Sequence, residues 1–300
     1  MQTNSYIALD SLGLHRVVYR EWGDPDHPHV VVCVHGLTRN SRDFDFLARA
    51  LAKDCRVVCV DVAGRGESDW LARKEDYGYP VYVADSVALL ARVTAPVFPG
   101  GLRGLVRRIL GARKTPTVDW VGTSMGGLIG MMVAARAQSP IRRLVLNDVG
   151  PLIPKASLAR IGEYVGRDPR FDSLESFEGH LRQIHAPFGP LTAEQWRHMA
   201  RHSHRRFDDG SIGFHYDPAI ALPFKSLALN DVDLWALWDQ VKCPTLVLRG
   251  AESDLLSHET AREMQTRGPG AKVLEFPGVG HAPMLMSEDQ IAPVREFLLA

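Results

Sequence analysis

The sequence lacks the features that mark several large classes of protein. No apolar run approaches the roughly 20 residues that a membrane-spanning helix needs. The first ten residues contain no basic segment followed by an apolar one, so we expect no signal peptide. Lys+Arg and Asp+Glu are equal at 35 each, so no net charge favours a nucleic acid as partner.

Cysteine is also scarce, and this bears on both compartment and metal binding. The four cysteines lie in or next to apolar runs, and none has the spacing of a metal site. We therefore expect buried free thiols and a reducing, cytoplasmic location. His198 and His202 are four residues apart, but the carboxylate context of a hydrolytic zinc site is missing. We expect neither a metal nor an organic cofactor.

What the sequence does contain is a regular alternation of apolar runs and helical patterns. The chain has 300 residues and is 45% hydrophobic, which is ample for a large core. Continuous Val- and Leu-rich runs separated by helices indicate a parallel sheet covered on both faces. Ligands of such sheets bind beyond the carboxyl ends of the strands. The main strands are expected at 15–22, 30–34, 56–60, 118–121, 141–146, 245–248 and 273–276.

The most informative motif is Gly-Thr-Ser-Met-Gly at residues 122–126. It follows the apolar run 118–121 and precedes a helical pattern over 128–137. A Gly-x-Ser-x-Gly between a strand and a helix is typical of a nucleophile elbow, which exposes the serine hydroxyl at a tight turn. A glycine-rich turn that only packs a helix on a strand is the alternative. The context of the motif favours Ser124 as a nucleophile.

Three further motifs supply that context, in chain order. They are His-Gly-Leu at 35–37, the turn Asp-Val-Ala-Gly-Arg-Gly-Glu-Ser at 61–68, and Gly-His-Ala-Pro at 280–283. Together with the serine motif they resemble the α/β-hydrolase family over nearly the whole chain. The resemblance implies an α/β fold with a mostly parallel eight-stranded sheet flanked by helices, and an inserted helical cap.

The domain organisation expected from this resemblance has two parts. Residues 1–150 and 241–300 form the α/β-hydrolase core, and residues 151–240 form the helical cap. A second departure lies at 96–116, where the part 101–114 has apolar residues at helical spacing and a basic opposite face. A docked surface helix is the simpler interpretation, and weak contact with a membrane surface or an acidic partner is the alternative.

The resemblance also assigns the remaining site residues. In this family the chain order is Ser, then Asp or Glu, then His, so His281 is the expected base. Asp254, which follows the strand at 245–248, is the expected acid. Asp148 is the alternative, since it ends the preceding sheet strand and some members of the family carry the acid there. The backbone N–H groups of Leu37 and Met125 are the expected oxyanion hole.

Two other residues of these motifs are expected to act mainly through structure. His35 is interpreted as a structural histidine that braces the loop after the strand 30–34, with a second base as the alternative. Asp61 is expected to satisfy backbone groups of its glycine-rich turn. Arg65, in the same turn, is a candidate to face the pocket.

The function expected from these residues is hydrolysis of carboxylic esters with small to medium acyl chains through an acyl-enzyme. The expected substrate is a small molecule. For the oligomeric state, a homodimer is an alternative that the sequence leaves open. Lactones and oligomeric hydroxyacid esters are variants of the same reaction. A carbon–carbon bond hydrolase of the meta-cleavage-product type is the alternative, although those enzymes usually place a large aromatic residue where this chain has Ala282. A receptor that retains the fold is the non-enzymatic alternative.

Overall fold

The computed structural model describes residues 1–95, 116–223 and 230–300 of the chain. The basic segment 101–114, with its expected docking or membrane contact, lies outside the described residues. Within the described residues, no helix is both long enough and apolar enough to cross a membrane. The four cysteines are free thiols, as expected, and three of them are buried.

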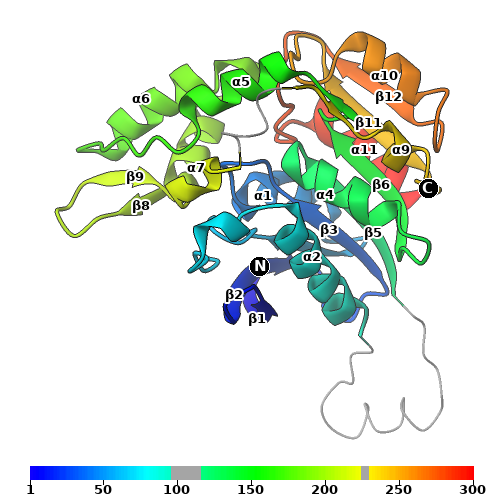
Figure 1. Ribbon diagram of the computed structural model, residues 1–300, viewed down its shortest axis with the longest axis horizontal. Helices are drawn as coiled ribbons and strands as arrows, with labels where there is room; N and C mark the ends of the chain where they lie inside the picture. The colour runs from blue at the N-terminus through cyan, green and yellow to red at the C-terminus, as the bar shows by residue number, and fades with distance from the viewer. Residues whose placement is uncertain (96–115, 224–229) are drawn as a thin grey trace, which may run out of the picture.

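An eight-stranded sheet forms the centre of the molecule, in the order β1-β2-β4-β3-β5-β6-β11-β12 (Figure 1). The pairs β1–β2 and β2–β4 are antiparallel, and the other neighbours are parallel. This confirms the expected fold class. The strands are β1 (Gln2–Leu9), β2 (Leu14–Trp22), β3 (His29–Val34), β4 (Arg56–Val60), β5 (Thr117–Thr123), β6 (Ile141–Asn147), β11 (Thr245–Gly250) and β12 (Lys272–Phe276).

Both faces of the sheet are covered, and alternate residues of one strand belong to different cores. Val30, Val32 and Val34 of β3 pack in one hydrophobic cluster, whereas Val31 and Cys33 pack in the other. Continuous apolar runs arise because side chains on both faces of such a strand are buried. The first cluster includes residues of α2 (Tyr79–Thr94), α4 (Met125–Ala134) and α10 (His258–Met264), and the second includes residues of α1 (Asp45–Leu51) and α11 (Glu288–Leu299).

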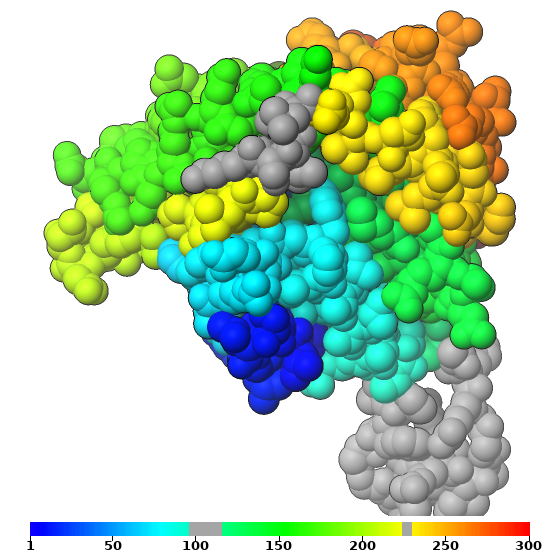
Figure 2. All heavy atoms as spheres, viewed as in Figure 1, coloured from blue at the N-terminus to red at the C-terminus, as the bar shows by residue number. Residues whose placement is uncertain are grey.

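Much of the segment between β6 and β11 lies over the carboxyl ends of the central strands (Figure 1), and in Figure 2 its green and yellow atoms lie against the cyan atoms of the N-terminal part. Two of its helices, α6 and α7, begin with a capping box: in α7, the side chains of Thr192 and Gln195 each accept from the other's backbone N–H. The segment also contains a short hairpin that the sequence pattern did not predict. Its elements are β7 (Leu152–Ile153), α5 (Lys155–Tyr164), α6 (Leu174–Ile184), α7 (Ala193–Ser203), β8 (His204–Arg206), β9 (Ile212–Phe214), β10 (Val232–Asp233) and α9 (Trp235–Trp238).

Short 3-10 helices complete the description. They are η1 (Ser41–Phe44), η2 (Lys74–Asp76), η3 (Ala186–Phe188) and η4 (Pro218–Ala221). The first two belong to loops of the core, and the last two belong to the segment between β6 and β11. The register of the sheet brings the ends of β3, β5, β6 and β11 to one edge, because Val34 pairs with Gly122, Thr123 with Asn147, and Asn147 with Leu248.

Candidate active site

Ser124 stands at a sharp turn between β5 and α4. Its backbone has φ 51° and ψ −117°, a conformation that costs a non-glycine residue free energy of order 1–3 kcal/mol. The glycines on either side permit this turn, since a Cβ on Gly122 would collide with the backbone of Gly126, and one on Gly126 with the carbonyl of Val34. The chain therefore forms the strand–turn–helix expected of a nucleophile elbow.

His281 lies in the loop after β12 and reaches back over the strand ends to Ser124. The distance from Ser124 Oγ to His281 Nε2 is 3.0 Å, so the hydroxyl can donate to the imidazole. On the other side of the ring, His281 Nδ1–H donates to Asp148 Oδ2 at 2.7 Å. The three side chains thus form a continuous hydrogen-bonded chain. The structure brings together Ser124 and His281, as the sequence predicted.

Asp148 follows β6 directly and is fully buried. Its Oδ1 accepts a hydrogen bond from the backbone N–H of Gly250 at 2.8 Å. Its Oδ2 accepts from Ser253 Oγ at 2.6 Å as well as from His281. A buried carboxylate needs such donors to offset its lost hydration. The hydrogen bonds also fix the orientation of the carboxylate toward the imidazole.

The expectation that Asp254 partners the imidazole is wrong, and Asp148 holds this place. The Asp254 side chain is 51% exposed and forms an ion pair with Arg160 of α5 at 2.5 Å. Its backbone carbonyl accepts from Ser157 Oγ, so helix α5 contacts both the side chain and the backbone of Asp254. The physical reason for the error is the sheet order: β6 and β11 are neighbours, so their ends lie at the same edge of the sheet, and residue spacing does not show which carboxylate points toward the imidazole.

Leu37 and Met125, the expected oxyanion donors, both line a cavity with Ser124. Met125 is the first residue of α4, and the first N–H groups of a helix have no partner inside the helix. On the other loop, a Cβ on Gly36 would lie 3.7 Å from the Cβ of Ser124, so the loop after β3 passes close to the serine. The two backbones approach the hydroxyl from different strands.

His35 braces this loop, as the structural interpretation predicted. It is fully buried, and its Nε2 accepts from the backbone N–H of Val62 at 3.0 Å. Its Nδ1–H donates to the carbonyl of Gly36 at 2.7 Å. Burial is the main cause that lowers the pKa of His35, to about 4. Both ring nitrogens are thus engaged by the backbone, and the imidazole that contacts Ser124 Oγ is that of His281.

The turn after β4 is built around Asp61, also as expected. Asp61 is fully buried and accepts from the backbone N–H groups of Ser41 and Glu67 and from Arg20 Nη1. Burial opposes its ionisation, but Arg20 and these N–H groups hold its pKa below the usual value. Arg65 in the same turn is fully buried. It was a candidate to face the pocket, but the described lining of the two cavities beside Ser124 does not include it.

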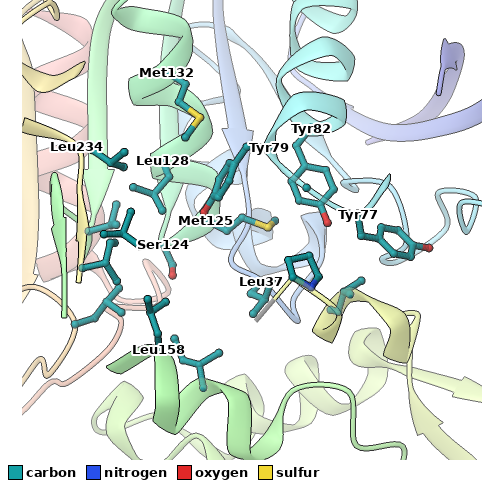
Figure 3. Close-up of a pocket in the computed structure, with 18 residues that line it drawn as sticks. Leu37, Tyr77, Tyr79, Tyr82, Ser124, Met125, Leu128, Met132, Leu158 and Leu234 are labelled. Atoms are coloured by element: carbon teal, nitrogen blue, oxygen red, sulfur yellow. The ribbon is translucent and has the colours of Figure 1, made fainter. Parts of the chain in front are cut away.

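Two cavities meet at Ser124. The first, of about 230 Å³, has an almost wholly apolar lining, and Figure 3 shows the Ser124 side chain among these residues. The second, of about 360 Å³, contains charged and polar side chains and reaches exposed residues at the surface. The first is lined by Tyr79, Tyr82, Leu128, Met132, Leu158 and Leu234, among others, and the second by Arg39, Asp43, Arg160, Asp254, His185 and His281, among others.

We call the first cavity the apolar cavity and the second the polar cavity. His281 lines the polar cavity, and Leu37, Ser124 and Ile161 line both. The boundary between the cavities therefore runs past the hydroxyl of the serine. His185, which lines the polar cavity, is stacked on Phe188 with ring centroids 4.4 Å apart. Burial, followed by the charge of Arg39, lowers the pKa of His185. This imidazole is therefore neutral and offers the cavity no positive charge.

The histidines of the segment between β6 and β11 do not form a favourable metal site. His198 and His202 lie near Asp45, with one ligand atom from each residue within 4.8 Å of the others. However, the Asp45 carboxylate is already bound by Arg42 through Nε and Nη2. Burial first, and then the charges of Arg42 and other cations, lower the pKa of His202 to about 3. The same positive charges oppose the binding of a divalent cation.

The sequence analysis missed Ser253, and it named Arg65 as a candidate to face the pocket, whereas Arg65 lies outside the described lining of both cavities. Ser253 donates to Asp148, and its hydroxyl oxygen also accepts from the backbone N–H of Leu256. No motif distinguishes such a serine from others in a turn. Arg65 contacts the residues of the expected oxyanion hole from behind, and its place in a Gly-Arg-Gly turn was the available signal.

Comparison with known proteins agrees with this geometry. Residues 31–294 match the model of the Alpha/beta hydrolase family. The chain is 45% identical to the 3-hydroxybutyrate-oligomer hydrolase of Cupriavidus necator, over 97% of this chain and 95% of that protein. A crystal structure of a Rickettsia typhi protein is 31% identical, with a TM-score of 0.87 over 99% of both chains.

An alpha/beta hydrolase from Novosphingobium aromaticivorans is 35% identical, with a TM-score of 0.81 over 99% of this chain and 98% of that one. Each of these likenesses extends over the core and the segment between β6 and β11 alike, since almost the whole chain is covered. The fold, the position of Ser124 and the match of the family model lead to one conclusion. The chain belongs to the alpha/beta hydrolase family and is a hydrolase.

Proposed function

We propose that this hydrolase cleaves carboxylic esters by a serine mechanism, with oligomers of 3-hydroxybutyrate or similar short hydroxyacid esters as substrates. The observation that carries the proposal is the hydrogen-bonded chain Ser124–His281–Asp148 at the meeting point of two cavities. The similarity to the Cupriavidus necator enzyme supports the choice of hydroxyacid oligomers.

In the proposed mechanism, Ser124 Oγ attacks the ester carbonyl while His281 Nε2 takes its proton. Asp148, bound to His281 Nδ1, stabilises the imidazolium that forms. The N–H groups of Leu37 and Met125 bind the negative charge that develops on the carbonyl oxygen. His281 then returns the proton to the leaving alcohol, and water resolves the acyl-enzyme by the same steps in reverse.

In the proposed mechanism, each half of the ester occupies one of the two cavities. The leaving oxygen must lie within hydrogen-bond reach of His281 Nε2, because this atom protonates it. His281 lines the polar cavity and is not part of the described lining of the apolar one. The alcohol half therefore lies in the polar cavity, and the acyl half occupies the apolar cavity, which is lined by Tyr79, Leu128 and Met132. Residues 151–240, proposed as the cap, contribute to both.

The test is hydrolysis of 3-hydroxybutyrate dimers and trimers, with p-nitrophenyl esters of increasing acyl length alongside, by the wild type and by Ser124→Ala. The wild type should release the monomer, and Ser124→Ala should lose at least about 10³-fold in kcat. Ser139→Ala, in the loop beyond the far end of α4, is the matched control and should keep full activity.

Activity that survives in pure Ser124→Ala would overturn the serine mechanism. Turnover of vinylogous diketones without turnover of esters would favour the carbon–carbon hydrolase. Ester turnover that excludes the hydroxybutyrate oligomers would keep the mechanism and reject the substrate.

A further inference from the structure

We propose that Arg65 is a positioning residue that holds the oxyanion hole in place from behind and adds a buried positive charge to it. The inference rests on the proposed function, because it concerns the same Leu37 and Met125 donors. It is carried by the contacts of the Arg65 guanidinium and by the lack of a carboxylate beside it.

The guanidinium of Arg65 connects the two loops that carry the proposed donors. Arg65 Nε donates to the carbonyl of Leu37 at 2.8 Å, and Arg65 Nη2 lies 3.7 Å from Met125 Sδ. Arg65 Nη1 donates to the carbonyl of Ala63 at 2.7 Å and to Tyr82 Oη at 2.8 Å. In Figure 3 the Met125 sulfur points toward the Tyr82 ring, and the guanidinium bonds to both residues.

Arg65 differs from the other buried arginines in its electrostatic partners. Among the described residues, Arg20, Arg39, Arg56 and Arg249 are also buried, and each forms an ion pair with a carboxylate. Arg65 has no carboxylate within ion-pair distance in the described part of the chain. The remaining segments, 96–115 and 224–229, contain no Asp or Glu. The guanidinium therefore forms no ion pair with a carboxylate of this chain.

An unneutralised buried charge is costly, even when its N–H groups are hydrogen-bonded to neutral acceptors. A methionine would fill a similar volume without this cost. A negative charge that appears only during the reaction gives the arginine a use that packing does not. The oxyanion at Leu37 and Met125 is such a charge, and low-dielectric surroundings strengthen its attraction to Arg65.

The charge of Arg65 already affects its neighbours. Burial is the main cause of the low pKa of His35; the hydrogen bond to Gly36 and the charge of Asp61 raise this pKa, and the positive charge of Arg65 lowers it. His35 bonds to the carbonyl of Gly36, next to Leu37. The field of the guanidinium therefore reaches the loop on which one of the proposed donors lies.

Backbone hydrogen bonds to the segment between β6 and β11 hold the turn that carries Arg65. The N–H of Gly66 donates to the carbonyl of His215 at 2.9 Å, and the N–H of Asp217 donates to the carbonyl of Gly64 at 2.8 Å. The backbone on both sides of Arg65 thus pairs with residues 215–217. A displacement of that segment would move Arg65, and with it the carbonyl of Leu37.

The experiment compares Arg65→Met and Arg65→Lys with the wild type. Arg65→Met removes the charge and every hydrogen bond, and kcat should fall about 100-fold with KM little changed. Arg65→Lys keeps the charge but lacks the planar fork that reaches Leu37 and Tyr82 together, so its loss should be smaller. The matched control is Arg56→Lys, a buried arginine ion-paired with Glu21 at the start of β4, which should lower the melting temperature without changing kcat.

A trifluoromethyl ketone gives a readout that a merely structural role would not move. Its adduct with the serine carries an oxyanion in the proposed hole. Its inhibition constant should rise across the Arg65 variants by the same factor as kcat/KM falls. The pKa of the hemiketal, measured by NMR, should rise in Arg65→Met and stay near the wild-type value in Arg65→Lys.

The inference is overturned if Arg65→Met binds the ketone as tightly as the wild type, with an unchanged hemiketal pKa. If Arg65→Met does not fold, Arg65→Lys provides the test. A kcat and a ketone inhibition constant equal to those of the wild type would then exclude a positioning role for Arg65. Labelling of the wild type by a fluorophosphonate separates the two proposals. Without a label on Ser124 the proposed function fails, whereas a labelled enzyme with unaffected Arg65 variants rejects the role of Arg65 alone.

Discussion

The ends of β3 and β6 and the loop after β11 surround the same serine, but their polar side chains stand in opposite environments. His35 and Asp148, at the first two ends, are fully buried, and each ring nitrogen and carboxylate oxygen has a hydrogen-bond partner. Asp254, in the loop after β11, is half exposed and paired with the equally accessible Arg160. Burial with complete hydrogen bonding therefore distinguishes the carboxylate that orients the imidazole from the one that does not.

Of the substitutions that test this comparison, Asp148→Asn should have the largest effect on activity. The amide keeps the shape of the side chain but has no second carboxylate oxygen to stabilise the imidazolium, so kcat should fall about 10³- to 10⁴-fold. Asp254 cannot compensate, because its carboxylate faces Arg160. Initial rates on a p-nitrophenyl ester measure the loss. A decrease of less than tenfold would show that another carboxylate serves His281.

His35→Gln extends the comparison to stability. The pKa of His35 is about 4 in the folded protein, against roughly 6.5 when unfolded. Between these values the unfolded chain binds a proton that the native protein does not, so the free energy of unfolding falls as the pH falls. The variant should therefore lose less stability between pH 7 and pH 5 than the wild type, by about 2 kcal/mol.

Urea unfolding of both proteins at the two pH values measures this difference. The other histidines are present in both proteins, so their contributions cancel in the comparison. They include His15, whose pKa is raised chiefly by its hydrogen bond to Asp85 and which acts in the opposite direction. Equal acid sensitivity of the two proteins would mean that His35 is protonated in the native state.

Ser253→Ala should have a smaller effect on the buried carboxylate. It removes one donor to Asp148 Oδ2 while Gly250 and His281 keep their bonds. A hydrogen bond to a charged group contributes roughly 1.5–3 kcal/mol to stability, and only part of this should appear in the rate. We expect kcat/KM to fall about tenfold. Ser253→Thr keeps the hydroxyl and should restore most of the activity, and failure of both variants alike would indicate a packing effect.

Asp254→Asn should have the smallest effect. The exposed pair with Arg160 contributes at most about 1 kcal/mol to stability, and the side chain does not reach His281. We expect kcat to stay within about twofold of the wild-type value, together with a nearly unchanged melting temperature. A loss as large as that of Asp148→Asn would return Asp254 to the role first expected of it and would contradict the observed hydrogen bonds.

The sequence predicted the parts of the fold that have strong local signals. Continuous apolar runs identified β3 to β6 and β11, because strands buried on both faces leave little room for polar residues. The short run at 273–276 also identified β12, although this edge strand is only partly buried. β1 was not identified, since it is an edge strand in which only Tyr6 and Ala8 are buried while Ile7 and Leu9 are exposed. The hairpin β8–β9 was also missed, because strands of three residues are too short to show a period.

The site was predictable where a residue is tied to a backbone motif. Ser124 lies in a turn that requires glycine on both sides, and His281 follows the last strand in a glycine-rich loop. The choice between Asp148 and Asp254 depends on burial and on the direction of side chains, which residue spacing does not encode. Likewise, the sequence shows Arg65 in a turn but not that the chain leaves it without a carboxylate.

A serine at the boundary of two cavities lets the two halves of an ester lie on opposite sides of the hydroxyl. In the proposed mechanism, the acyl half remains bound among Tyr79, Leu128 and Met132 after the alcohol half has left past His281, so the polar cavity is then free. Any hydroxyl compound that enters there competes with water for the acyl-enzyme. At high concentrations of hydroxyacid, the same site would therefore lengthen or exchange chains instead of shortening them, and the direction of catalysis would follow the supply of acceptor.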